Sequence, residues 1–264
     1  MNGTTIYAEV RGVGLAILII PGGAEDAEGW RPVAEQLTGH TVVTYDRRGT
    51  LRSGREDWPG RGSSQHADDA AGLIEELGLG QVVVFGASSA GIIAVQLAIR
   101  HPALVRRALV YEPGYLLCVP EGDELRSQVD GAVDAYLAHH PLDWTGAYQA
   151  FGEVADGAPG PASDDVLAAP SDTDWHRRRE ELNAEAFVRD DLPILTAELP
   201  DETLLASSPV DIRFSHGAET GPVFRDIAVH LAAVRGATPD VVDGAGHWLY
   251  LCPAAAAEYL RAHA

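Results

Sequence analysis

The chain has 264 residues, of which 46% are hydrophobic and 22% are charged, a composition typical of a globular protein and not of a disordered one. Its formal net charge is −20 and it contains no lysine, which argues against binding to nucleic acids or anionic membranes and excludes a catalytic lysine. No apolar run is long enough to span a bilayer and no signal-peptide pattern opens the chain, so we expect a cytoplasmic protein whose cysteines, Cys118 and Cys252, are free thiols.

In chain order, apolar segments rich in β-branched residues alternate with segments of helical periodicity. This alternation predicts the α/β class, with a mostly parallel sheet and helices on both of its faces. Strands are expected at 4–10, 16–20, 41–45, 81–85, 107–111, 210–214 and 239–242, and helices at 28–37, 68–77, 92–100, 223–234 and 254–261.

One region, residues 120–206, interrupts this alternation because it carries no convincing strand pattern. We interpret it as a helical cap, or lid, inserted into a core made of residues 1–119 and 207–264. Helices are expected at 125–138 and 176–187, and a loose segment at 157–165 is where we expect the lid to move. The cap aromatics are candidates for a substrate pocket, although packing against the sheet is the simpler explanation for any one of them: Trp144, Tyr148 and Trp175 first, then Phe151 and Phe187.

The segment GASSAG at 86–91 follows a buried strand and opens a helix. That is the setting in which a G-x-S-x-G motif forms a nucleophile elbow, a sharp turn that presents a serine at the edge of the sheet. Ala90 replaces the last glycine of the motif, so two registers are open, with either Ser88 or Ser89 as the nucleophile. We prefer Ser88, which lies two residues after the glycine that ends the strand. The competing interpretation is a serine-rich turn without chemistry.

The segment GAGH at 244–247 follows the last predicted strand. A histidine at this place can act as the general base, because its pKa lies near neutrality and it can take a proton from serine and return it. His247 is therefore the expected base, and His216, which also follows a strand, is its only rival. The oxyanion hole needs two backbone donors, which we expect to be the N–H of Ser89 and that of Gly23 in the glycine turn after the second strand.

With these motifs the chain resembles the α/β-hydrolase superfamily over nearly its whole length, and the segment DRRGTLRS at 46–53 resembles a structural turn of that family. Most members carry the acid in a G-x-x-D turn, which here reads GAET at 217–220, so Thr220 stands where the aspartate is usual. Glu112, in the segment YEP at 111–113, is better placed. The fungal zearalenone lactonases look similar, with the acid in an E-P-like turn at this point. The resemblance therefore implies Glu112 as the acid, with Glu219 as the alternative.

The expected function is that of a serine hydrolase that cleaves an ester or lactone of a medium-sized apolar, polyketide-like molecule through an acyl-enzyme on Ser88. The same triad also serves carbon–carbon bond hydrolases, thioesterases and acyltransferases. Two other classes are left open. One is a ligand receptor with a hydrolase fold, and the other is a non-catalytic or non-hydrolytic tailoring protein that uses only the binding pocket. No metal motif, phosphate loop or dinucleotide fingerprint is present, so no cofactor and no metal are expected. The expected partner is a small apolar substrate, and a homodimer is left open.

Overall fold

The computed structural model describes residues 2–155, 170–195 and 197–264. A seven-stranded sheet with the order β1-β3-β2-β4-β5-β6-β7 forms its centre. β1 pairs with β3 in antiparallel orientation, and all the other neighbouring strands are parallel, which confirms the expected mostly parallel sheet. The strands are β1 (Ala8–Arg11), β2 (Leu15–Ile20), β3 (His40–Tyr45), β4 (Val82–Ala87), β5 (Val105–Tyr111), β6 (Asp211–Gly217) and β7 (Asp240–Val242).

The central strand β4 shows how the sheet divides the hydrophobic core. All its residues are buried, as expected of a strand covered on both faces. Successive side chains of a strand point to opposite faces. Val84 accordingly joins the hydrophobic cluster on one side of the sheet, and Val83 and Phe85 join the cluster on the other side.

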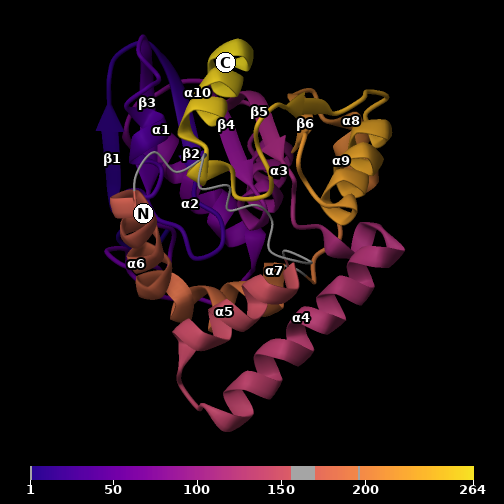
Figure 1. The fold of residues 1–264 in the computed structure, drawn as a ribbon. Coiled ribbons are helices and arrows are strands. Elements are labelled where there is room, and N and C mark those ends of the chain that lie inside the picture. The colour runs from indigo at the N-terminus through magenta and orange to yellow at the C-terminus, as the bar shows by residue number, and fades with distance from the viewer. Residues whose placement is uncertain (1, 156–169, 196) are drawn as a thin grey trace.

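Helices cover both faces of the sheet (Figure 1). One cluster is completed by α2 (Ser63–Glu76), α3 (Ser89–Arg100) and α9 (Pro222–Val234), and the other by α1 (Arg31–Ala34) and α10 (Pro253–His263). The helix expected at 28–37 is thus shorter. The reason lies in Asp26, whose carboxylate accepts hydrogen bonds from the N–H groups of Glu28 and Gly29 and holds the preceding residues in a turn.

A run of helices connects β5 to β6. Val129, Val133, Tyr148 and Phe187 are among the residues of its own hydrophobic cluster. The elements are a short 3₁₀ turn (Leu116–Cys118), α4 (Pro120–His139), α5 (Trp144–Ala155), α6 (Pro170–Ala186), a π-helical segment (Phe187–Asp191), α7 (Leu192–Leu195) and α8 (Glu202–Ser207). Of these, α4, α5, α6 and α7 lie below the sheet in Figure 1, and α8 lies beside α9. The lid segment expected at 157–165 lies outside the described residues, and the division into core and cap stays a prediction.

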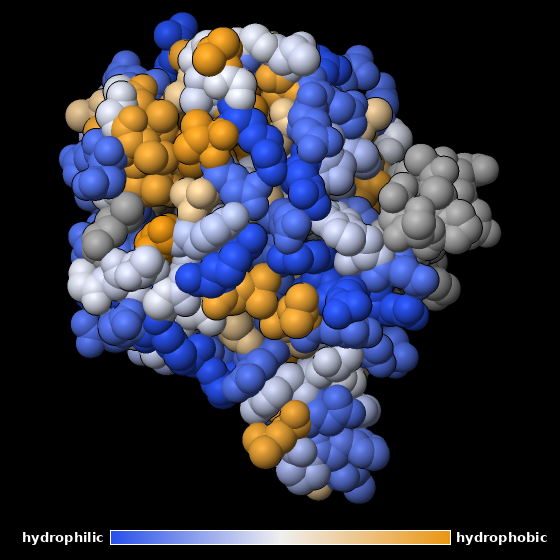
Figure 2. Space-filling view, turned by 90° about the vertical axis from the view of Figure 1, so that its left-hand side faces the viewer, coloured by the Kyte–Doolittle hydropathy of each residue, from blue (hydrophilic) through white to orange (hydrophobic). Residues whose placement is uncertain are grey.

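Hydrophilic residues dominate the face of the molecule in Figure 2, where hydrophobic residues gather in several separate groups. Both cysteines are free thiols. Within the described ranges, no helix is both long and apolar enough to cross a membrane.

Candidate active site

Ser88 lies at the sharp turn between β4 and α3, with φ 53° and ψ −124°. A non-glycine residue rarely adopts a positive φ, and such strain is concentrated at functional sites. Small neighbours make the turn possible, because a Cβ on Gly86 would lie 2.3 Å from the carbonyl oxygen of Ala90. The methyl group of Ala90 itself is buried in the core, so the departure from the usual glycine is accommodated. Ser89 begins α3 and is buried, whereas Ser88 at the corner of the turn is partly exposed.

His247 joins two other predicted residues in a chain of hydrogen bonds. Its Nε2 lies 3.2 Å from Ser88 Oγ, and its Nδ1 lies 2.7 Å from Glu112 Oε2. The phenyl ring of Phe224 stacks on the imidazole, with 3.9 Å between ring centroids and 22° between planes. The loop that carries His247 is also fixed, because Tyr111 Oη donates a hydrogen bond to the carbonyl oxygen of Gly246. Sequence reasoning did not identify Phe224, since nothing in the sequence places an α9 residue beside this loop.

Glu112 directly follows β5 and is completely buried. Its carboxylate accepts hydrogen bonds from the N–H of Gly217 at 2.7 Å and from the hydroxyl of Thr220 at 2.8 Å. Burial alone would raise the pKa of Glu112, but the hydrogen bond and charge of His247, with these donors, outweigh burial and place the pKa below its usual value. Thr220, at the usual place of the family's acid, thus serves as a donor to Glu112. Glu219 is exposed to solvent.

The two expected oxyanion-hole donors lie at the same edge of the sheet, one on a loop and one at the start of α3. β2 and β4 are parallel neighbours, with Ile20 paired to Gly86, so the loop with Gly23 reaches the same edge of the sheet as the elbow. Ser89 is in the first turn of α3, where backbone N–H groups have no partner within the helix. A Cβ on Gly23 would lie 2.4 Å from Cε2 of Phe187, so the glycine lets Phe187 of the π-helical segment pack on this loop.

Glu25 belongs to the same loop, is buried, and was not identified from the sequence. Its Oε2 accepts hydrogen bonds from the N–H of Gly22 at 2.6 Å and from Trp30 Nε1 at 2.7 Å. Burial raises the pKa of this carboxyl to about 7, although both donors and the charge of Arg47 oppose the increase. Glu25 therefore changes its charge near neutral pH while it holds the loop.

We expect the substitution Glu25→Gln to stabilise the protein increasingly as the pH rises. The pKa of Glu25 is about 7 in the folded protein and 4.5 as the unperturbed value, so the folded state binds the proton more tightly. Stability is therefore lost between about pH 4.5 and 7, by up to about 3 kcal/mol. Glutamine keeps an oxygen for both donors and removes the charge. Urea unfolding at several pH values checks this, with the exposed Glu76→Gln as control, and parallel pH dependence in wild type and Glu25→Gln would contradict it.

The three aromatic residues first chosen for a pocket lie in two different places. Tyr148 is in the hydrophobic cluster of the helices between β5 and β6, where its ring contacts those of Phe151 and Phe187 at centroid distances of 5.8 Å. Trp144 packs against that cluster. Trp175 lies on α6, where the guanidinium of Arg31 is 5.7 Å from its ring centroid. Phe187 contacts Gly23, one of the two expected oxyanion-hole residues.

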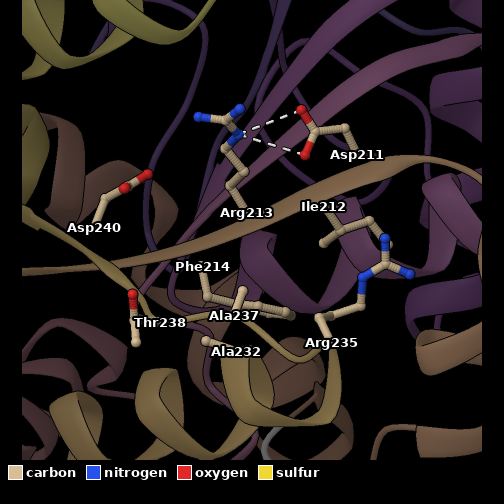
Figure 3. Close-up of a pocket in the computed structure, with 9 residues that line it drawn as sticks. All are labelled: Asp211, Ile212, Arg213, Phe214, Ala232, Arg235, Ala237, Thr238 and Asp240. Atoms are coloured by element: carbon tan, nitrogen blue, oxygen red, sulfur yellow. Dashed lines mark hydrogen bonds and ion pairs between the residues drawn. The ribbon is translucent and has the colours of Figure 1, made fainter.

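A hollow of about 440 Å³ lies elsewhere on the surface (Figure 3). It is lined by the start of β6, including Asp211 and Arg213, and by Asp240 at the start of β7. In a parallel sheet the functional loops follow the carboxyl ends of the strands, where Ser88 and Glu112 lie. This hollow therefore does not belong to the candidate active site.

Known proteins resemble the chain in sequence and in fold. The uncharacterized hydrolase YraK of Bacillus subtilis is 40% identical over 126 residues, which are 47% of this chain and 46% of YraK. RutD of Azorhizobium caulinodans, named as a candidate carbamate hydrolase, is 38% identical over 102 residues, 38% of each chain. The chain thus spans less than half the length of these two relatives. The structure of an alpha/beta hydrolase from Sphaerobacter thermophilus has a TM-score of 0.75 and 25% identity, over 98% of this chain and 96% of that one.

The family model for the alpha/beta hydrolase fold matches residues 16–158, which is more than half of the chain. This segment contains the serine turn, the glutamate and the glycine loop described above. The sheet order and the flanking helices agree with the match. The chain belongs to the α/β-hydrolase fold family.

Proposed function

We propose that the protein is a serine hydrolase that cleaves an ester or lactone of a medium-sized apolar substrate. The observation that carries this proposal is the hydrogen-bonded chain from Ser88 through His247 to Glu112, with distances of 3.2 Å and 2.7 Å. A nucleophile, a base and an acid that orients the base are the three groups that acyl transfer requires. Their location at the carboxyl ends of the central strands also supports the proposal.

In the proposed reaction, Ser88 Oγ attacks the carbonyl carbon while its proton passes to His247 Nε2. The N–H groups of Gly23 and Ser89 stabilise the oxyanion. The alcohol leaves with the proton from His247, and an acyl-enzyme remains on Ser88. Water then gives a proton to His247 and attacks the acyl carbon. The carboxylic acid leaves, and Ser88 regains its proton.

The apolar side chains around the glycine loop support an apolar substrate. Phe187 packs on Gly23, and Tyr148 and Phe151 surround Phe187. The E-P turn with Glu112 is the feature that resembles the zearalenone lactonases, and it supports lactones as a substrate class. The partial similarity to RutD adds carbamates, whose carbonyl group is open to the same attack. Thioesters and carbon–carbon bonds next to a carbonyl remain the alternative substrates for the same triad.

A fluorophosphonate probe followed by intact-mass spectrometry tests the proposal directly. We expect one adduct on the wild-type protein and none on Ser88→Ala, because the probe reacts only with an activated serine. A panel of p-nitrophenyl esters, lactones, carbamates and thioesters then identifies the substrate class. An unlabelled wild-type protein would contradict the hydrolase and support a ligand receptor with this fold.

We also infer a cytoplasmic location. Cys118 and Cys252 are both free thiols, and burial raises the pKa of each thiol, which keeps both in the unreactive protonated form. Free thiols are typical of a reducing compartment. Localisation of a tagged protein by microscopy or cell fractionation checks this inference.

A further inference from the structure

Arg47 is a buried arginine whose contacts the proposed reaction does not explain. It follows β3, the strand beside β2, and only 1% of its surface is exposed. Its Nη2 donates a hydrogen bond to the carbonyl oxygen of Gly22 at 2.9 Å. Because a buried charge is costly unless it is paired, an arginine at this place calls for a specific function.

The carbonyl of Gly22 and the N–H of Gly23 belong to the same peptide unit. In a trans peptide these two groups point in opposite directions. Arg47 thus holds the carbonyl end of the unit, and the N–H end is directed away from Arg47. A hydrogen bond to the carbonyl also polarises the peptide and strengthens its N–H as a donor. On the other side of Gly22, Glu25 holds the preceding N–H, so the backbone is fixed on both sides.

A cap residue holds Arg47 in turn. Asp191 pairs with Arg47 Nη2 at 2.5 Å, and both side chains are almost completely buried. His66 Nε2 lies 3.1 Å from Arg47 Nη1, and desolvation lowers the pKa of His66, so the neutral ring can accept this hydrogen bond. Asp191 ends the π-helical segment that begins at Phe187. This segment therefore contacts Gly23 directly and Gly22 through Arg47, and π-helical turns are frequent at functional sites.

We propose that Arg47 is a positioning residue of the oxyanion hole, which aims the N–H of Gly23 at the reacting carbonyl and is itself held by Asp191 of the cap. The inference rests on the proposed serine hydrolase function. It makes the cap part of the catalytic arrangement as well as a cover for the substrate. Arg47 does not touch the substrate in this proposal, and its effect passes entirely through the peptide between Gly22 and Gly23.

The test removes the whole ion pair, because Arg47→Met alone would leave Asp191 buried without its partner. We expect Arg47→Met/Asp191→Asn to lower kcat for p-nitrophenyl butyrate by about 10–100-fold. This fall in kcat is at most as large as the fall caused by removing one oxyanion-hole donor outright. KM should change little. An alkyl trifluoromethyl ketone forms a serine adduct that carries an oxyanion and so mimics the transition state. Its inhibition constant should rise by the same factor by which kcat/KM falls.

The chain offers a matched control in the neighbouring arginine. Arg48 is equally buried and pairs with Asp69 at 2.7 Å. It donates hydrogen bonds to the carboxylate of Asp69 and to the carbonyl oxygens of Glu56 and Asn2. Arg48→Met/Asp69→Asn should lower the midpoint of thermal unfolding and leave the ketone inhibition constant unchanged. Loss of folded protein reduces apparent kcat but not the affinity of the molecules that remain active, so the inhibition constant separates positioning from stability.

Three outcomes are distinguishable. A weaker ketone affinity in the Arg47 double variant alone supports the inference. An unchanged affinity, or an equal loss in both double variants, overturns it and leaves the serine hydrolase intact. A wild-type protein that neither hydrolyses the ester nor reacts with the fluorophosphonate overturns the proposed function, and the inference with it.

Discussion

The Ser88→Ala variant is expected to lose about 10⁴–10⁶-fold in kcat for any ester that the wild type hydrolyses, since members of such a triad act as a unit. Alanine removes the oxygen that lies 3.2 Å from His247 Nε2 and so removes the acyl-enzyme route. The folded structure should be largely unaffected, because Ser88 is partly exposed at the corner of the turn and alanine removes only its hydroxyl group. Initial rates with p-nitrophenyl butyrate, with circular dichroism as a check of folding, measure the loss.

Ser89→Ala is the matched control and tests the other register of the motif. The side chain of Ser89 is buried, with 4% of the residue exposed, and only its backbone N–H enters the proposed chemistry. Alanine keeps that N–H, so most of the activity should remain. Full loss in Ser89→Ala together with activity in Ser88→Ala would show that the nucleophile is Ser89.

Glu112→Gln is expected to lower kcat at least a hundredfold and by up to about 10⁴, the effect of replacing the carboxylate in the best-known triad. The carboxylate accepts the Nδ1–H of His247 and stabilises the positive charge that the ring gains. A glutamine amide can donate to Nδ1 instead, which favours the wrong tautomer. Steady-state kinetics across pH measure the loss, with KM as the check that substrate binding is retained.

The control for Glu112 is Glu219→Gln, which should lose little activity. Glu219 is exposed, and Nδ1 of His247 is already occupied by Glu112. The reverse ranking of the two variants would assign the acid to Glu219. Thr220→Val provides a milder test, because it removes the hydroxyl that donates to Glu112 at 2.8 Å and should reduce kcat less than Glu112→Gln.

Local patterns were sufficient to predict most of the core. Runs of β-branched residues indicated the strands, and the glycines around Ser88 indicated the turn, since both depend on neighbours in sequence. Boundaries were less accurate. The first strand begins at Ala8 and not at residue 4, and α2 begins at Ser63, earlier than the expected 68. α5 was not predicted as a helix, because its aromatic residues were interpreted as core packing or pocket candidates and not as one face of a helix.

The contacts between distant segments could not be predicted. Arg47 reads in sequence as part of a structural turn, and nothing near it indicates a partner in the cap. The sequence around Asp26 likewise gives no sign of its distant partners. Its Oδ2 accepts hydrogen bonds from Arg179 Nε and Asn183 Nδ2 of α6, each at 2.8 Å. Such pairs depend on how the inserted helices dock on the sheet, and the pattern of hydrophobic residues says nothing about that placement.

The ion pair between Arg47 and Asp191 sets a condition for protein engineering. Exchanging residues 120–206 for the corresponding segment of a relative would replace Asp191 but leave Arg47 in place. Here a cap without an acid at position 191 would leave the guanidinium unmatched inside the chimera. A transplanted cap should therefore carry the aspartate with it, or Arg47 should be replaced in the recipient at the same time.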